Sequence, residues 1–187
     1  DAYFDAYTAA IAAIGATSGG LGAESGPGIS VKLSALHPRY SRAQRDRVLA
    51  ELLPRLRELA LLARAQDMGL AIDAEESERL DLSLDLAEAL AVDPSLGGWN
   101  GLGVVVQAYQ KRGPAVIDWV IGLARASGRR LSVRLVKGAY WDSEIKRAQV
   151  EGQAGYPVFT RKVHSDVCYL ACARRLFAAA DAVYPQF

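Results

Sequence analysis

The 187 residues include 22 basic and 21 acidic side chains, and 51% of them are hydrophobic. A chain of this length and composition can bury a substantial core as one globular domain or as part of a larger one. The formal net charge of +1 excludes a broad basic surface for nucleic acid, and no apolar run approaches the roughly 20 residues that cross a bilayer.

Residues 1–15 place apolar side chains at helical spacing, and residues 17–28 form a flexible glycine-rich linker. Beyond the linker, apolar strands alternate with amphipathic helices. The predicted strands are 29–36, 70–75, 103–109, 131–140 and a strand start at 182–187. The predicted helices are 41–67 with a kink or break at Pro54, 77–92, 114–127, 142–153 and 161–180. Cys168 and Cys172 lie four apart in the last helix, which indicates reduced core thiols and favours a cytoplasmic protein.

Strands that alternate with helices through short connections predict parallel βα units rather than hairpins. A doubly wound sheet needs a glycine-rich phosphate turn after its first strand, whereas the glycines of residues 19–28 precede the first predicted strand. The pattern therefore favours an α/β fold of the parallel (βα)8 barrel type. Residues 29–187 would supply the N-terminal and central βα units of this barrel, and residues 1–28 an N-terminal helix and linker.

Polar side chains occur near the carboxyl ends of four successive predicted strands, where a βα-barrel gathers its functional residues. They are Lys32, Asp73, Gln107, Arg134 and Lys137. Lys32 and Asp73 come from consecutive strands, so they can form a neutralising pair, either within a site or as a structural ion pair. The Gln107 amide both donates and accepts, which suits the imide edge of a flavin ring and equally a bond to a neighbouring residue.

The sequence LSVRLVKGAYWD runs an apolar strand directly into a group of cationic, glycine and aromatic residues. Cations on such a strand need anionic or hydrogen-bonding partners. A separation of three places Arg134 and Lys137 on opposite faces of a strand, so we predict that the strand ends between them. Gly138 then permits close backbone approach to a ligand, while Tyr140 and Trp141 can cover a ring or pack within the loop.

Five motifs make the chain recognisable: VKLSALHPRY, IDAEE, VVQAY, VRLVKGAYWD and YPVFTRKVHSDVCYLAC. From about Gly26 to the C-terminus, the chain resembles the proline dehydrogenase domain of the bifunctional proline utilisation flavoenzymes. The resemblance implies a distorted (βα)8 barrel with noncovalently bound FAD, which oxidises L-proline to Δ1-pyrroline-5-carboxylate in the first step of proline catabolism. It also implies electron transfer to a membrane quinone, a fused pyrroline-5-carboxylate dehydrogenase domain, a homo-oligomer, and a cytoplasmic protein that can lie peripherally on the inner face of the bacterial membrane.

The resemblance also assigns roles to individual residues. Arg134 would lie near flavin N5 and stabilise the anionic reduced ring, and Tyr140 would pack on the substrate ring. Lys32 and Asp73 would form a paired, partly buried set under the proline site. The other implied cofactor contacts are Gln107 at the pyrimidine edge, Lys137, Gly138 and Ala139 along the ribityl and pyrophosphate portion, Trp141 over that portion, and Thr160, Arg161 and Lys162 towards the phosphate and adenosine end.

The family completes its site with residues that this sequence does not contain. A consecutive arginine pair on the final barrel helix, which clamps the proline carboxylate, and a tyrosine on a late strand would both lie beyond Phe187. The first barrel strand, with an acidic residue that gates the site, would lie before Asp1. Arg174 and Arg175 lie in a helix before the last predicted strand, so the clamp role is not transferred to them.

Two other functions are compatible with the residues. Lys32 or Lys137, each at a strand end, could form a Schiff base with a carbonyl substrate in an aldolase-like lyase. Alternatively, the chain is a catalytically incomplete barrel fragment that presents a surface to partners. His37 and His164 have no metal-ligand spacing, so no metal site is predicted.

Overall fold

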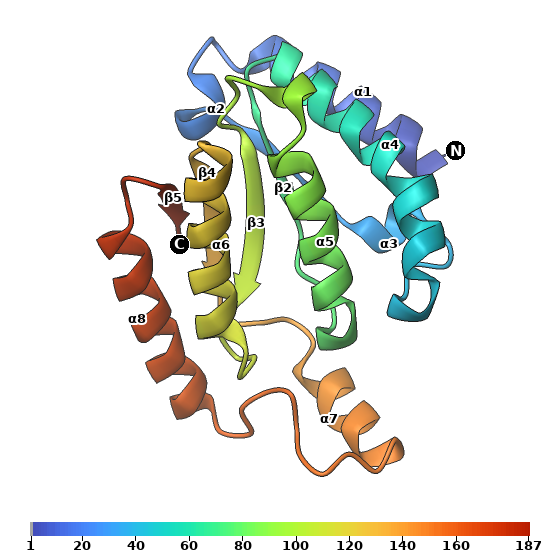
Figure 1. The fold of residues 1–187 in the computed structure, drawn as a ribbon, viewed down its shortest axis with the longest axis vertical. Helices are drawn as coiled ribbons and strands as arrows, with labels where there is room; N and C mark the ends of the chain where they lie inside the picture. The colour runs from blue at the N-terminus through green and yellow to red at the C-terminus, as the bar shows by residue number, and fades with distance from the viewer. Residues whose placement is uncertain (1) are drawn as a thin grey trace.

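The computed structural model describes residues 2–187 (Figure 1). The strands are β1 (Gly28–Val31), β2 (Gly69–Ile72), β3 (Leu102–Gln107), β4 (Leu131–Val136) and β5 (Val183–Gln186). The α-helices are α1 (Ala2–Thr17), α2 (Gly22–Ser25), α3 (Leu33–Leu36), α4 (Arg45–Ala65), α5 (Leu80–Ala91), α6 (Gly113–Ser127), α7 (Trp141–Val150) and α8 (Lys162–Ala178). Short 3-10 helices are η1 (Arg42–Gln44), η2 (Ser77–Arg79) and η3 (Pro94–Leu96).

The five strands form one parallel sheet in the order β1-β2-β3-β4-β5. Each strand lies beside its predecessor, whereas the strand order of a doubly wound sheet reverses at a switch point. The long helices that connect the strands cover one face of the sheet (Figure 1). This arrangement is an arc of a parallel βα-barrel, which confirms the predicted fold class.

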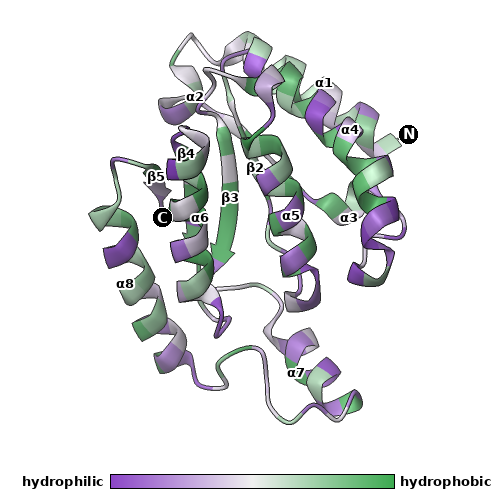
Figure 2. Cartoon of the chain, in the orientation of Figure 1, coloured by the Kyte–Doolittle hydropathy of each residue, from purple (hydrophilic) through white to green (hydrophobic). Residues whose placement is uncertain are grey.

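Along each strand, successive side chains point alternately to the face covered by the helices and to the opposite, concave face of the sheet. Val104 and Val106 of β3 join the core under the helices, while Val105 and Gln107 line a pocket on the concave side. β3 is hydrophobic along most of its length (Figure 2). Each large aliphatic side chain contributes about 1.5–3 kcal/mol when buried. The core between the sheet and the helices therefore stabilises the packing of the helices on the sheet, and polar groups line the concave side.

The strand predicted over 29–36 is too long, because it ends at Val31 and helix α3 follows. Leu33 and Leu36 are both at most 1% exposed. Residues three apart share one face of a helix but lie on opposite faces of a strand. A helical turn therefore buries both leucines where a strand would bury one of them.

Helix α4 continues through Pro54, so of the predicted kink or break the break does not occur. Leu52 and Leu56, on either side of the proline, are both fully buried. A proline inside a helix costs about 3 kcal/mol, and burial of two leucines offsets a cost of that size. Packing on the sheet thus outweighs the local preference of the sequence.

Strand β4 ends at Val136, which confirms that the strand stops between Arg134 and Lys137. The last predicted strand is present as β5. Cys168 and Cys172 are free and buried, and burial raises the pKa of the Cys172 thiol to about 12. Across residues 2–187, no helix combines the length and apolar character that crossing a membrane requires.

Candidate active site

An open pocket of about 380 Å³ lies on the concave side, at the carboxyl ends of the strands. All five polar residues predicted to gather at the strand ends line this pocket. They are Lys32, Asp73, Gln107, Arg134 and Lys137. Tyr140, Gly138 and Ala139 from the turn after β4 complete one wall. The predicted convergence of these side chains is therefore confirmed.

Arg134 lines the pocket and pairs with Asp73. Its Nη2 donates to Asp73 Oδ1 at 3.3 Å and to Ser30 Oγ at 2.8 Å. The strand register explains this contact, since Ile72 pairs with Val104 and Arg134 pairs with Val105. Asp73 and Arg134 thus occupy the same layer of the sheet, separated by one strand.

The predicted ion pair between Lys32 and Asp73 is wrong as a direct contact. Within residues 2–187, the cation that lies within 4.0 Å of the Asp73 carboxylate is Arg134. The long Lys32 side chain instead places Nζ over the Tyr140 ring, 5.9 Å from the centroid. A hydrogen bond to Tyr140 is the main cause that raises the pKa of Lys32, and the charge of Asp73 adds to it.

Gln107 uses its amide within the protein. The side chain is 4% exposed, its Nε2 donates to the Glu75 carbonyl oxygen at 2.9 Å, and its Oε1 accepts from Ala139 N–H at 3.1 Å. The alternative in which Gln107 bonds to neighbouring residues therefore holds in this structure. The amide joins the segments that follow β2 and β4.

Gly138 is explained by a neighbouring aromatic ring. Its φ is +137°, and a Cβ built on it would lie 2.2 Å from Cδ1 of Tyr109. The Tyr109 side chain therefore approaches this glycine closely, and the expected close approach of a ligand stays a prediction. Only glycine satisfies both the dihedral angle and this contact.

A second pocket of about 390 Å³ adjoins the first and shares Lys137 and Gly138 with it. Trp141, Thr160 and Lys162 line this second pocket. The resemblance assigns all three residues to contacts with the same cofactor. The remaining lining residues are Tyr109, Phe159 and Ser165. In the described chain, Arg161 lines neither pocket and is exposed.

Two lysines at the second pocket share one carboxylate. Lys137 Nζ lies 2.6 Å from Asp166 Oδ1, and Lys162 Nζ lies 2.7 Å from Asp166 Oδ2. These contacts raise the pKa of Lys137 and lower that of Asp166. Sequence reasoning missed Asp166, although its spacing of four from Lys162 is a recognisable helical ion-pair signal.

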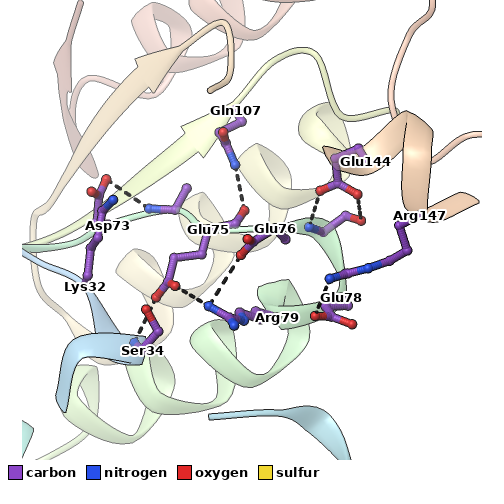
Figure 3. A network of polar contacts seen from close by, with 12 residues as sticks. Lys32, Ser34, Asp73, Glu75, Glu76, Glu78, Arg79, Gln107, Glu144 and Arg147 are labelled. Atoms are coloured by element: carbon purple, nitrogen blue, oxygen red, sulfur yellow. Dashed lines mark hydrogen bonds and ion pairs between the residues drawn. The ribbon is translucent and has the colours of Figure 1, made fainter. Parts of the chain in front are cut away.

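Sequence reasoning also missed a polar network around the segment that follows β2 (Figure 3). Glu75 is buried, accepts from Ser34 N–H at 3.0 Å, and pairs with Arg79 at 2.6 Å. Glu144 of α7 accepts from Ser77. Glu75 belongs to the motif IDAEE, and Arg79 follows it at a spacing of four residues. Ser34 is 41 residues away, so no local pattern identifies that partner.

A sequence profile of the family described as Proline dehydrogenase matches residues 1–187. The chain belongs to the proline dehydrogenase family. This membership agrees with the resemblance on which the residue roles were based.

Relatives of this family are similar to the chain over 90–100% of its length. The bifunctional protein PutA of Salmonella typhimurium is 65% identical over 186 residues, which cover 100% of this chain and 14% of that protein. The bifunctional protein PutA of Rhizobium meliloti is 62% identical over 168 residues, or 90% of this chain and 14% of that protein. The chain thus spans about one seventh of these curated relatives.

A crystal structure of a Bradyrhizobium japonicum Proline Utilization A mutant matches the fold with a TM-score of 0.97 and 57% identity. The match covers 99% of this chain and 19% of that one. The parallel arc described above is therefore the arrangement found in a solved structure of the family.

Proposed function

We propose that the chain supplies much of the cofactor site and part of the substrate site of an FAD-dependent proline dehydrogenase. The reaction is oxidation of L-proline to Δ1-pyrroline-5-carboxylate, the first step of proline catabolism. The observation that carries the proposal is the meeting of Lys32, Asp73, Gln107, Arg134 and Lys137 in one pocket of a chain of this family.

The residues present suit a flat ring joined to a diphosphate. The first pocket combines the Arg134 guanidinium, the Gln107 amide and the Tyr140 ring, which can contact a polar aromatic system through hydrogen bonds and stacking. The second pocket adds Lys137 and Lys162, which can bind phosphate as point charges. Because the pockets adjoin at Lys137 and Gly138, one elongated ligand can occupy both.

The chemistry that FAD supplies when bound is acceptance of the hydride that leaves C5 of proline. Arg134 would help to hold the ring in this pocket, and its permanent positive charge would favour negative charge that develops there. The Asp73 carboxylate holds the guanidinium in place at 3.3 Å. Lys32 and Tyr140 lie together on the wall of the same pocket, where they can contact substrate.

The charge state of the lysines disfavours the aldolase-like alternative. A Schiff-base lysine needs a neutral amine and hence a lowered pKa. Hydrogen bonds to Tyr140 and to Asp166 raise the pKa of Lys32 and Lys137, respectively. Both amines are therefore charged at neutral pH, which suits binding of anions rather than attack on a carbonyl.

The finer features of the proposal concern the full-length protein. Electrons would pass to a membrane quinone, so the protein would act at the inner face of the bacterial membrane. A fused pyrroline-5-carboxylate dehydrogenase domain would use the product, in line with the name "bifunctional" carried by the relatives. We also propose that the protein forms a homo-oligomer.

Flavin uptake tests the proposed role of Arg134. We expect the full-length protein to bind FAD, and Arg134→Met to weaken binding by about tenfold, because a charge-assisted contact is lost. Arg125→Met is the matched control, since Arg125 of α6 forms an exposed ion pair with Asp181 and lines neither pocket. Equilibrium dialysis with FAD measures both variants, and equal affinity of Arg134→Met and wild type would contradict the proposal.

A further inference from the structure

Helix α7 is attached to the rest of the molecule through a buried carboxylate. The residues of α7 that are buried are Glu144 and Ala148, and Glu144 is 2% exposed. The helix extends beyond the carboxyl ends of the strands (Figure 1). Burial of a carboxylate costs free energy unless the carboxylate accepts hydrogen bonds. The groups that donate to Glu144 therefore stabilise its buried position.

Ser77 supplies the partners of Glu144, which is labelled in Figure 3. Its backbone N–H donates to Glu144 Oε1 at 2.5 Å, and its hydroxyl donates to Glu144 Oε2 at 2.7 Å. Ser77 is the first residue of η2, which leads directly into α5. The first N–H groups of a helix lack partners within the helix and attract negative charge. Glu144 therefore caps this N-terminus from 67 residues away.

The same attachment determines where the site residues before α7 lie. Ala139 N–H donates to Gln107, and Trp141 begins α7 three residues before Glu144. The segment 138–144 is thus fastened at Ala139 to the last residue of β3, and at Glu144 to Ser77, which follows β2. Tyr140 and Trp141 lie between these two points and line the first and second pockets, respectively.

We propose that Glu144 is a positioning residue for the ligand site, which fixes Tyr140 and Trp141 over the two pockets by accepting the hydrogen bonds of Ser77 at the start of η2. The proposal rests on the proposed function for the identity of the ligand. Glu144 itself lines neither of these pockets within the described residues. Its effect on binding would therefore pass through the placement of the segment 138–144.

Substitution of Glu144 in the full-length protein tests this proposal through FAD affinity and the visible circular dichroism of bound flavin. We expect Glu144→Ala to weaken FAD binding by about tenfold, as loss of hydrogen bonds to a charged group predicts, and to change the dichroism. Glu144→Gln should lie between Ala and wild type, because its single oxygen can replace only one acceptor. Wild-type affinity and dichroism in Glu144→Ala would overturn the proposal.

Glu78→Gln is the matched control. Glu78 joins the same two segments through an ion pair with Arg147 at 2.8 Å, but its side chain is 48% exposed. Exposed pairs contribute little, so we expect wild-type flavin affinity and dichroism. An effect of Glu78→Gln as large as that of Glu144→Ala would contradict a special role for the buried cap.

Amide hydrogen exchange separates this proposal from the proposed function and covers the case in which Glu144→Ala does not fold. We expect Glu144→Gln, without added flavin, to speed exchange in residues 138–147 by at least about tenfold while the core strands keep wild-type rates. Unchanged exchange in that segment would overturn the positioning role. If the wild-type protein binds no FAD but Glu144→Gln speeds exchange in residues 138–147, then the proposed function is contradicted. The role of Glu144 in positioning this segment is supported in that case.

Discussion

At the scale of single residues, the site depends on side chains whose partners come from distant parts of the chain. Arg134 and Asp73 are 61 residues apart, and Gln107 and Ala139 are 32 apart. Asp73, Gln107 and Arg134 were identified as site residues because polar groups at parallel strand ends converge, and Ala139 through the family resemblance. Sequence reasoning did not predict that Asp73 pairs with Arg134 rather than with Lys32. The choice of partner depends on the register across three strands and on side-chain length.

Gly138→Ala is a prediction at this scale. A Cβ at this position would collide with the Tyr109 ring, and the φ of +137° disfavours any side chain. Strain of this kind costs about 1–3 kcal/mol, so we expect lower stability in urea unfolding and weaker FAD binding. Gly122→Ala, in a helix with open space around the new methyl group, is the control. Wild-type stability and binding in Gly138→Ala would show that the turn adapts freely.

At the scale of secondary structure, the alternation of strands and helices could be predicted from hydrophobic periodicity alone. The predicted strand over 29–36 is an error where packing outweighs local preference, because Leu33 and Leu36 form a buried helical turn. For the same reason α4 does not break at Pro54. The cap between Glu144 and Ser77 could not be predicted, because its two residues are distant in sequence and neither has an unusual local pattern. Local patterns therefore predict the elements better than the bonds that join them.

The end of α5 provides a pH-dependent prediction. Asp93 caps η3, and hydrogen bonds from Ser95, together with the Arg57 guanidinium, lower the pKa of its carboxyl group. A lowered folded-state pKa adds stability above the unfolded value of about 3.9, and this stability is lost as pH falls through the folded value. Asp93→Asn should therefore be less stable than wild type at pH 7, with the difference shrinking below about pH 4.

Urea unfolding at a series of pH values measures this difference between Asp93→Asn and wild type. Asp46→Asn, which alters an aspartate whose side chain is 99% exposed, is the control and should follow the wild-type curve. A stability difference for Asp93→Asn that stays constant as pH falls below about 4 would show that the Asp93 charge is not the cause.

At the scale of the whole molecule, the fold explains why the pocket is polar. The helices cover one face of the sheet with aliphatic side chains, and the concave face carries the charged and amide groups at the strand ends. Barrel topology could be predicted from the order of elements, and the consecutive strand order confirms it. The identity of the ligand could not be predicted from periodicity, and it came from motif resemblance and family membership.

The most direct test of the proposed reaction is the visible absorption of the full-length protein without oxygen, before and after addition of L-proline. We predict an oxidised flavin spectrum that bleaches when proline is added, because electrons pass from the substrate to the bound cofactor. A protein that takes up no FAD, or a flavin spectrum that proline leaves unchanged, would contradict the assignment of this pocket to proline oxidation.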